Sequence, residues 1–333
     1  MKRLGRWIGG LLFAIVGIIA VAWAFGAIWF DGPFRAGNKI AAVLLAIAFV
    51  VTLFFVRPFW RKLGVFAVLF SGVLVWWLTI KPTQDSDWQP DVAQEAWADI
   101  QGDEVTLHNV RNCDYRTETD YTPHWEARTV RISQITGIDI AVDYWGSPWI
   151  AHPIVSFQFA DVPAVCFSIE TRKKLGQAYS TIGGLYRQFE LIYIVANERD
   201  VIRLRTNYRK EDIFLYRTTI SPLRARERFL EYIHSLNALR DKPRWYNAIT
   251  TNCTTSIRTQ HPPGERMPWD WRLLLNGKGD ELMYERHLIV TGGLPFTELK
   301  ERSLINAQAQ AANDAPDFSE RIRAQLVIPE PSN

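Results

Sequence analysis

The chain of 333 residues is poor in cysteine and carries little net charge. Its three cysteines are too few for a disulfide scaffold, and an odd count leaves at least one thiol unpaired within a single chain. The formal net charge is only +3, and no basic stripe interleaved with aromatic residues occurs along the chain. These two absences argue against a nucleic-acid partner. No internal repeat is visible, which argues against a repeat architecture.

Charged residues are almost absent from the first 80 residues, where three apolar runs follow one another. The runs cover residues 7–30, 40–59 and 64–80. The first two reach the roughly 20 residues that cross a bilayer core, and the third is near the lower limit. None has the polar face of a soluble helix, and a cleavable signal peptide fits poorly because two more runs follow the first. The sequence therefore predicts three transmembrane helices.

Basic residues near these runs indicate the orientation in the membrane. They gather before the first run and between the second and third, at Lys2, Arg3, Arg6, Arg57, Arg61 and Lys62. The loop between the first two runs has only Arg35 and Lys39, with Asp31. Because cytoplasmic loops are enriched in lysine and arginine, we expect a cytoplasmic N-terminus in a bacterial inner membrane. Three crossings then put everything after residue 80 outside, which in a Gram-negative cell is the periplasm.

The remainder of the chain is predicted to be an α+β domain. A polar linker at residues 81–91 leads into a domain at 92–311, and a polar tail follows at 312–333. Strands are expected at residues 125–132, 138–144, 154–159, 164–170, 191–196, 201–206 and 213–217. Helices are expected at residues 91–99, 221–239, 269–274, 279–285 and 297–311. Strands followed by helices are typical of the α+β class.

Cys253 lies among small polar residues in the stretch TTNCTTSI. Thr251 or Asn252 is a suitable helix N-cap, so Cys253 is expected in the first turn of a short helix. Backbone N–H groups there favour a thiolate, lower the pKa of the thiol and can receive an oxyanion. Cys253 is therefore a candidate nucleophile, with a structural or disulfide role as the alternative. Cys113 and Cys166 are either ordinary buried thiols or a pair.

A thiol nucleophile needs a base, and His152 is the best placed of the six histidines. It opens an expected strand, where a sheet can present a side chain to a helix N-terminus; the alternative is a structural histidine. Glu170 or Thr171 lies opposite it, depending on the hairpin loop that joins the two strands. Glu170 is the better choice chemically, because a carboxylate orients an imidazole and stabilises its protonated form. A surface ion pair with Arg172 or Lys173 is the alternative for Glu170.

Four blocks in order, WGSPWIAHPIVSFQF, FSIETRKKLGQAYS, FELIYIVANERDVIRLRTNYR and WYNAITTNCTTSI, resemble the periplasmic domain of the Lnb-type lipoprotein N-acyltransferase family. The resemblance covers residues 105–260, approximately. It implies a fold similar to circularly permuted papain-like thiol enzymes of the NlpC superfamily. In that arrangement an early strand supplies the histidine and a later Asn-Cys pair opens a helix. His152 and Cys253 match these two places, whereas the third polar position matches Glu170 or Thr171 only loosely.

The resemblance and the expected location together imply acyl transfer through a cysteine thioester. The acyl donor would be a membrane phospholipid, and the acceptor would be the free α-amino group of a diacylglyceryl-cysteine lipoprotein. We expect neither a cofactor nor a metal ion. Arg203 and Arg205 are candidates to bind the donor phosphate, with a solvated strand face as the alternative. Tyr144 and Trp145 are candidates to line an acyl pocket or contact the bilayer, with core packing as the alternative.

Two other classes of function remain open from the sequence. A periplasmic thiol amidase or peptidase acting on peptidoglycan would use the same two residues, with water replacing the lipid amine. It gains nothing obvious from three membrane spans. A non-catalytic membrane module that binds lipid or protein would need neither Cys253 nor His152.

Overall fold

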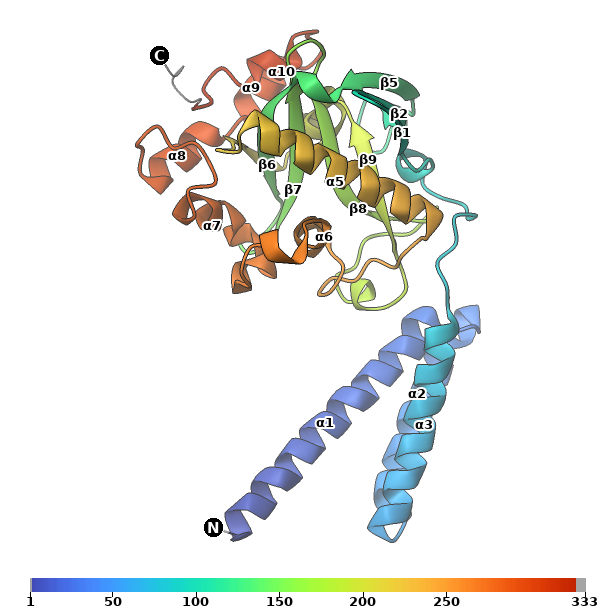
Figure 1. Cartoon of the computed structure of the whole chain (residues 1–333). Helices are drawn as coiled ribbons and strands as arrows, with labels where there is room; N and C mark the ends of the chain where they lie inside the picture. The colour runs from blue at the N-terminus through green and yellow to red at the C-terminus, as the bar shows by residue number, and fades with distance from the viewer. Residues whose placement is uncertain (1, 328–333) are drawn as a thin grey trace. The chain divides into compact units, whose positions relative to one another are not determined.

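The structure is a computed structural model that describes residues 2–327, with side chains from residue 11 onward. The chain divides into two compact units (Figure 1). The first, called here the helical unit, comprises Met1–Gln84, Tyr179–Glu190 and Trp245–Ala248. The second, called the sheet unit, comprises Asp85–Ala178, Leu191–Arg244 and Ile249–Asn333.

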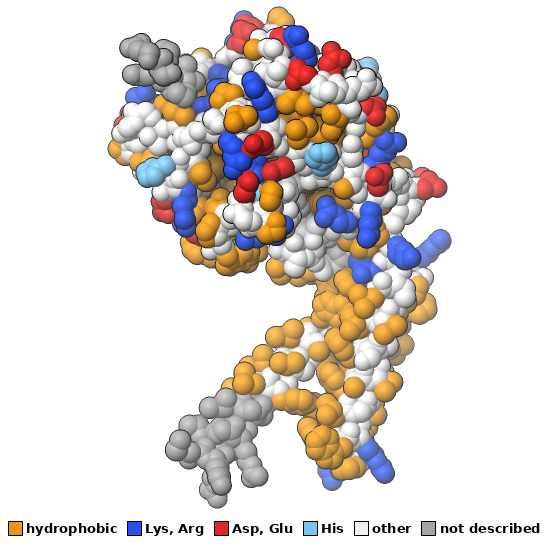
Figure 2. All heavy atoms as spheres, viewed as in Figure 1, with side chains coloured by type: hydrophobic (Ala, Val, Ile, Leu, Met, Phe, Trp, Pro, Cys, Tyr) orange, Lys and Arg blue, Asp and Glu red, His pale blue; other side chains and the backbone are white. Residues whose placement is uncertain are grey.

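Three long apolar helices make up most of the helical unit. They are α1 (Lys2–Asp31), α2 (Asn38–Phe55) and α3 (Phe59–Thr79). Each contains a stretch long and apolar enough to cross a membrane, at Leu11–Asp31, Arg35–Phe55 and Phe59–Thr79. Figure 2 shows that hydrophobic side chains dominate the visible surface of these helices, as contact with lipid requires. The three predicted apolar helices are thus confirmed, although the third begins earlier than expected.

Asp31, at the end of α1, connects several parts of the helical unit. Its Oδ2 accepts hydrogen bonds from Trp77 Nε1 at 2.6 Å and from the backbone N–H of Arg187 at 2.9 Å. Its Oδ1 accepts one from Gln188 Nε2 at 2.7 Å. The guanidinium of Arg187 also lies 4.0 Å from the centre of the Trp77 ring, a cation–π contact. The segment Tyr179–Glu190 is therefore tied to the ends of α1 and α3.

The sheet unit is built around an eight-stranded sheet. Its strands are β1 (Trp97–Gln101), β2 (Glu104–Arg111), β5 (Trp125–Arg131), β6 (Ile135–Tyr144), β7 (Ala151–Phe159), β8 (Val165–Arg172), β9 (Glu190–Ala196) and β10 (Asp212–Arg217). The order is β1-β2-β9-β8-β7-β6-β10, and β5 pairs with β2. β7 runs antiparallel to both of its neighbours, β6 and β8. A separate hairpin joins β3 (Asp114–Tyr115) and β4 (Tyr121–Thr122).

Helices flank the sheet, and in the chain they all come after β9. They are α4 (Glu198–Arg203), continued by a π-helix (Leu204–Arg209), then α5 (Pro222–Asp241), α6 (Cys253–Gln260), α7 (Gly279–Glu285), α8 (Phe296–Ser303), α9 (Asn306–Ala311) and α10 (Phe318–Arg321). Short 3-10 turns include Pro90–Val92, Trp271–Leu273 and Asn276–Lys278. This arrangement confirms the α+β class.

The two faces of the sheet are covered by different helices. Helix α5 lies across one face of the sheet (Figure 1). There Phe229 of α5 packs edge-on against Phe157 and Phe167, with its ring centre 5.2 and 5.9 Å from theirs. On the other face, a fully apolar core includes Ile154 from β7 and Phe318 from α10, together with residues of α4 and α9. Because successive residues of a strand point to opposite faces, even-numbered and odd-numbered positions of β7 belong to different layers.

Several expected elements differ from the structure. Residues 201–206 lie in α4 and the π-helix rather than in a strand, because a short apolar run fits either period and here packs on the sheet. The helix expected at 91–99 is only the turn Pro90–Val92, after which β1 begins. The helix expected at 297–311 is interrupted between α8 and α9.

The polar tail expected at residues 312–333 is also different in the structure. Ala312, Phe318 and Ile322 are each 1% exposed and belong to the core of the sheet unit. Arg323 donates to Asp139 Oδ2 at 2.9 Å and to Glu198 Oε2 at 2.7 Å. The chain therefore remains part of the folded unit well past residue 311. The last residues of the expected tail, 328–333, lie outside the described part of the chain.

Candidate active site

Helix α6 begins at Cys253 because the residue before it is a strong cap. Asn252 Oδ1 accepts the backbone N–H of Thr255 at 2.9 Å, and Thr255 Oγ1 accepts the backbone N–H of Asn252 at 2.9 Å. This reciprocal pair is a capping box, which fixes where the first helical turn starts. Of the two caps considered from the sequence, the structure uses Asn252. Cys253 is thus the first helical residue, and it is buried, with the whole residue 8% exposed.

His152 is the second residue of β7, and a chain of hydrogen bonds fixes its ring. Its Nε2 lies 2.7 Å from Ser168 Oγ, and Ser168 Oγ donates to Glu170 Oε1 at 2.8 Å. Ile154 pairs with Ser168 across β7 and β8, so continuing this register by two residues sets Glu170, and not Thr171, opposite His152. The carboxylate reaches the imidazole through a serine that the sequence analysis did not identify. Ser168 and Glu170 are two residues apart and so lie on one face of the strand, a spacing from which the role of Ser168 could have been predicted.

The direction of these hydrogen bonds sets the tautomer of His152. The nearby Arg205 and Arg111 hold the pKa of Glu170 well below its usual value although burial opposes this, so Glu170 is an acceptor. The Ser168 hydroxyl must then donate to Glu170, and its remaining lone pairs accept from Nε2–H of His152. Nδ1 is left as the basic nitrogen of the ring. Burial, with a further contribution from Arg205, lowers the pKa of His152 to about 3.

Arg205 holds this carboxylate from the other side. Its Nη2 donates to Glu170 Oε1 at 2.9 Å, and its Nε donates to Asp143 Oδ2 at 2.9 Å. Asp143 is the direct partner of His152 across β6 and β7, and burial raises its pKa to about 7 against the effect of Arg205. Arg172 is engaged elsewhere, with Glu95 at 2.7 Å. Arg205 therefore orients Glu170, which in turn orients His152 through Ser168.

The thiol of Cys253 is neutral in this environment. Burial raises its pKa above the ordinary value, and the hydrogen bonds from the Thr254 side chain and the first-turn N–H groups offset this only in part. The expectation of a lowered pKa from the helix start was wrong, because desolvation outweighs the helix N-terminus. Together with the neutral His152, this gives an uncharged thiol and an uncharged base in the resting protein.

The Asn276 side chain connects the start of α6 to the start of β7. Its Nδ2 donates to Thr254 Oγ1 at 3.0 Å and lies 3.7 Å from Cys253 Sγ. Its Oδ1 accepts the backbone N–H of Ala151, the residue before His152, at 2.9 Å. One amide therefore contacts the thiol and holds the strand that carries the candidate base. No pattern in the sequence singled out this asparagine, since it lies in a loop and only the fold brings it here.

His152 and Cys253 lie at the same end of the sheet without a direct bond. In the described part of the chain, no hydrogen bond joins the imidazole to the thiol; Nε2 is bonded to Ser168 and Sγ is approached by Asn276. Negative charge on Glu170 nevertheless contributes to raising the pKa of Cys253. Hydrogen bonds between catalytic groups are often long before substrate binds. Asn276 thus links Cys253 to the start of β7, on which His152 lies, while the side chain of His152 faces Ser168 and the alternate residues of β7 line an apolar pocket.

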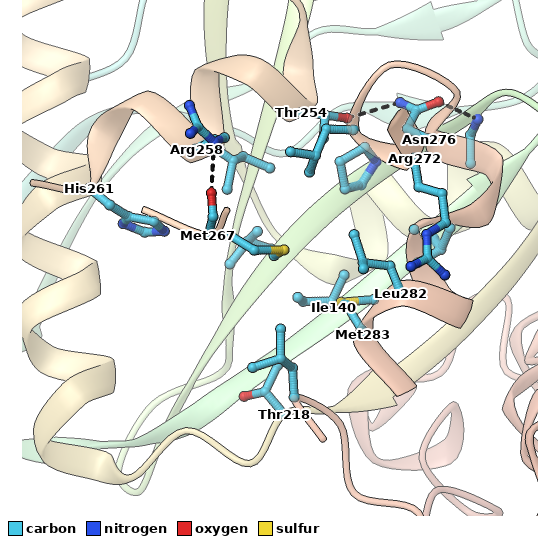
Figure 3. A pocket seen from close by; sticks show the side chains of 18 of the residues that line it. Ile140, Thr218, Thr254, Arg258, His261, Met267, Arg272, Asn276, Leu282 and Met283 are labelled. Atoms are coloured by element: carbon cyan, nitrogen blue, oxygen red, sulfur yellow. Dashed lines mark hydrogen bonds between the residues drawn. The ribbon is translucent and has the colours of Figure 1, made fainter. Parts of the chain in front are cut away.

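The apolar pocket lies near the start of α6 (Figure 3), and its lining residues include neither Cys253 nor His152. Its walls come from β6 and β7, from α6, and from the segment that runs from Met267 to Leu288. Thr254 and Asn276, the two neighbours of the Cys253 sulfur, both line it, and their hydrogen bond is drawn in Figure 3. Cys253 is therefore close to this pocket through Thr254 and Asn276, although it does not itself line the pocket.

Of the four residues expected to bind substrate, three have other partners inside the fold and one is exposed. Arg203 is 1% exposed and donates to Asp314 Oδ1 at 3.1 Å, and Arg205 is 4% exposed in the ion pairs described above. Neither lines the pocket or has a free guanidinium for a phosphate. Tyr144 Oη donates to the backbone oxygen of Gly277 at 2.8 Å and also lies outside the pocket wall. Trp145 is exposed, with its ring centre 6.5 Å from that of His152, so it stays a candidate for substrate contact.

The two other cysteines lie away from this region of the sheet unit. All three cysteines are free thiols, so Cys113 and Cys166 are not paired. Burial raises the pKa of Cys113 to about 11, and it raises that of Cys166 well above the ordinary value. Among the described residues, no cluster of three or more histidine, cysteine or acidic side chains is suited to hold a metal ion.

In comparison with known proteins, one family model matches the segment that contains this site. The family model described as the Lnb N-terminal periplasmic domain matches residues 121–277, a segment that contains His152, Ser168, Cys253 and Asn276. No curated protein and no solved structure matches the chain. The resemblance seen in the sequence is confirmed, and residues 121–277 belong to the Lnb family of periplasmic domains.

Proposed function

We propose that this protein is a membrane-anchored thiol acyltransferase. It transfers a fatty acyl chain from a phospholipid to the N-terminal amine of a diacylglyceryl-cysteine lipoprotein. The Lnb-type domain and the three apolar helices support a role in lipoprotein biogenesis at a membrane. The observation that carries the finer proposal is the position of Cys253 Sγ, which lies at a capped helix start, next to an amide donor and an apolar pocket.

In the first half-reaction, Nδ1 of His152 takes the proton of Cys253 as the sulfur attacks the donor ester carbonyl. A C–S bond forms, the C–O bond to the glycerol breaks, and the same proton passes to the leaving alkoxide. The products are a thioester on Cys253 and a lysophospholipid. Because thiol and imidazole are both neutral at rest, His152 acts as a general base during attack rather than as part of a preformed ion pair.

In the second half-reaction, the lipoprotein amine attacks the thioester. The C–N bond forms, the C–S bond breaks, and the amine proton passes through His152 back to the Cys253 sulfur. In both steps negative charge develops on the acyl oxygen. Asn276 Nδ2 and the backbone N–H of Cys253, both close to the sulfur, are the donors that we assign to it.

The test is to isolate the acyl-enzyme from the full-length protein in nanodiscs. With phospholipid alone, the wild type should gain one fatty acyl mass, sensitive to neutral hydroxylamine, and release one lysophospholipid. A diacylated lipopeptide with a free amine should discharge the chain as an amide, while an N-acetylated lipopeptide should not. Cys253→Ala should gain no acyl group, and His152→Ala should load about 100- to 10,000-fold more slowly.

Cys113→Ala is the matched control, because it removes a buried thiol outside the site and should load normally. Hydroxylamine-resistant acyl label on Cys253→Ala, or no label on the wild type during turnover, would overturn the mechanism. Cleavage of peptidoglycan peptides without acyl transfer would instead indicate the amidase alternative.

A further inference from the structure

We infer that the apolar pocket beside Cys253 holds the transferred acyl chain, and that its depth selects the length of that chain. This inference rests on the proposed function and extends it to the substrate. The pocket measures about 220 Å³, far more than the roughly 30 Å³ that one water occupies in the liquid. Its walls are largely aliphatic side chains, among them Ile140, Val142, Ile257, Leu282 and Met283 (Figure 3). A space of this kind is suited to a hydrocarbon rather than to water.

The charged residues at its wall already have partners. Arg258 Nε donates to the backbone oxygen of Met267 at 3.0 Å. Arg272 is paired with Asp270 at 3.0 Å and with Glu285 at 2.8 Å. Arg272 is thus held by two carboxylates and Arg258 by one backbone oxygen, and most of the remaining lining is apolar, which favours a hydrocarbon over a charged or peptidic substrate.

The position of the pocket relative to the sulfur identifies which part of a lipid it receives. Cys253 does not itself line the pocket, but Asn276 does, and Asn276 Nδ2 is 3.7 Å from Cys253 Sγ, so an acyl carbon bonded to the sulfur lies near the pocket. The first methylenes then pass Thr254, and the chain continues between Ile257 of α6 and the β6–β7 surface. A lipid headgroup stays outside, because the ester carbonyl must reach the sulfur and the pocket lining is largely apolar.

Gly279 supplies a way to shorten this pocket with little disturbance. It lines the pocket, its backbone is helical at φ −68° and ψ −36°, and a Cβ added there meets no atom within 4 Å. Gly279→Leu should therefore fold and fill part of the space. Gly264 offers the matched control, because an added Cβ there also meets nothing within 4 Å and the residue is outside the pocket wall.

The first experiment measures acyl loading of Cys253 in nanodiscs that hold an equimolar mixture of long-chain and short-chain phospholipids. Each methylene buried contributes about fourfold, which corresponds to about 0.8 kcal/mol. Gly279→Leu should thus lower the ratio of long to short thioester by at least about tenfold. Gly264→Leu should keep the wild-type ratio. Intact-mass spectrometry reads both thioesters in one sample.

The second experiment needs no enzymatic turnover. Alkyl methanethiosulfonates of increasing chain length modify Cys253 directly, and the modified peptide is quantified against Cys253→Ala. The wild type should react faster as the alkyl chain grows, and Gly279→Leu should lose this increase while Gly264→Leu keeps it.

The outcomes separate the two proposals. If Gly279→Leu keeps the wild-type chain-length preference in both experiments, the pocket assignment is overturned. If the wild type still loads normally from phospholipid, that result leaves the acyltransferase proposal intact. A length preference towards the alkyl reagents that Gly279→Leu abolishes, without any loading from phospholipid, would support the pocket and overturn the acyltransferase.

Discussion

The Ser168 hydroxyl stands between His152 and Glu170, so removing one oxygen atom tests the relay without touching either end. In Ser168→Ala the Nε2–H of a buried imidazole loses its acceptor and the ring is no longer oriented. The rate of acyl loading should fall by roughly 100-fold or somewhat less, as for a modest misplacement of a catalytic group. Ser168→Thr keeps the hydroxyl and should retain most of the rate. Loading by Ser168→Ala at the wild-type rate, with an unchanged melting temperature, would exclude the relay.

The neutral resting state of Cys253 gives a second prediction at this scale. Its pKa is raised above the ordinary thiol value, so the thiolate fraction is small at pH 7 and increases only as pH rises towards and beyond 9. His152, with a pKa of about 3, stays unprotonated over the same range and cannot stabilise a thiolate by its charge. The rate of alkylation of Cys253 by iodoacetamide should therefore rise continuously from pH 6 to pH 9. A plateau of fast alkylation near pH 6 would instead indicate a preformed thiolate–imidazolium pair.

The positions of single residues in helices and strands were predictable where neighbouring residues in the sequence indicate them. Cys253 follows a cap residue and His152 opens a strand, and both signals act over a few neighbours in the sequence. The pKa of Cys253 was not predictable, because the sequence shows the helix start but does not show burial. Asn276 reaches the site from a distant turn, and Ser168 acts through strand register.

At the scale of elements, α10 tests whether the chain after residue 311 is part of the fold. Phe318 is 1% exposed in the core, so Phe318→Ala should lower the free energy of unfolding by about 3–5 kcal/mol. Leu223→Ala on α5 removes a side chain that is 65% exposed and should change it by no more than about 0.5 kcal/mol. Urea unfolding of the full chain, followed by tryptophan fluorescence, measures both. Equal stability of the two variants would mean that α10 is a detachable tail.

Elements with strong boundary signals were predicted closely, and short ambiguous ones were not. α5 begins after Ser221, whose side chain accepts the backbone N–H of Arg224, and Pro222 occupies its first turn. Residues 201–206 carry an apolar pattern too short to separate a strand from a helix, and the pattern is satisfied by packing on the sheet. Arg203 and Arg205 were consequently expected on a strand, either as phosphate ligands or on a solvated face, although both are buried.

At the scale of the whole molecule, the basic residues predict on which side of the membrane the sheet unit lies. An alkaline phosphatase reporter, active only after export, should be active when fused after residue 90. The matched fusion after residue 57, in the basic loop between α2 and α3, should be inactive. Activity of the second fusion and not the first would reverse the orientation and remove the periplasmic site.

The segment that matches the family model, residues 121–277, is shorter than the sheet unit that contains the candidate active site. The match ends at residue 277, yet Leu282, Met283 and Leu288 line the pocket and Phe318 completes the core. On the N-terminal side, β1 and β2 extend the sheet before the match begins. The family match thus covers the residues around the thiol, while part of the pocket wall and of the core comes from segments outside the match.

The burial of the three thiols bears on how this protein would survive in the oxidising compartment that the basic residues predict for the sheet unit. Thiolates, rather than thiols, react with peroxides and with disulfide-forming enzymes. Cys113, Cys166 and Cys253 are all buried with raised pKa values, so each offers very little thiolate to a diffusing oxidant. A sulfur that is deprotonated only when an ester has reached it spends little time in the form that oxidants attack. The same burial that slows its reaction with small electrophiles should therefore also protect Cys253, which has no disulfide partner, from oxidation.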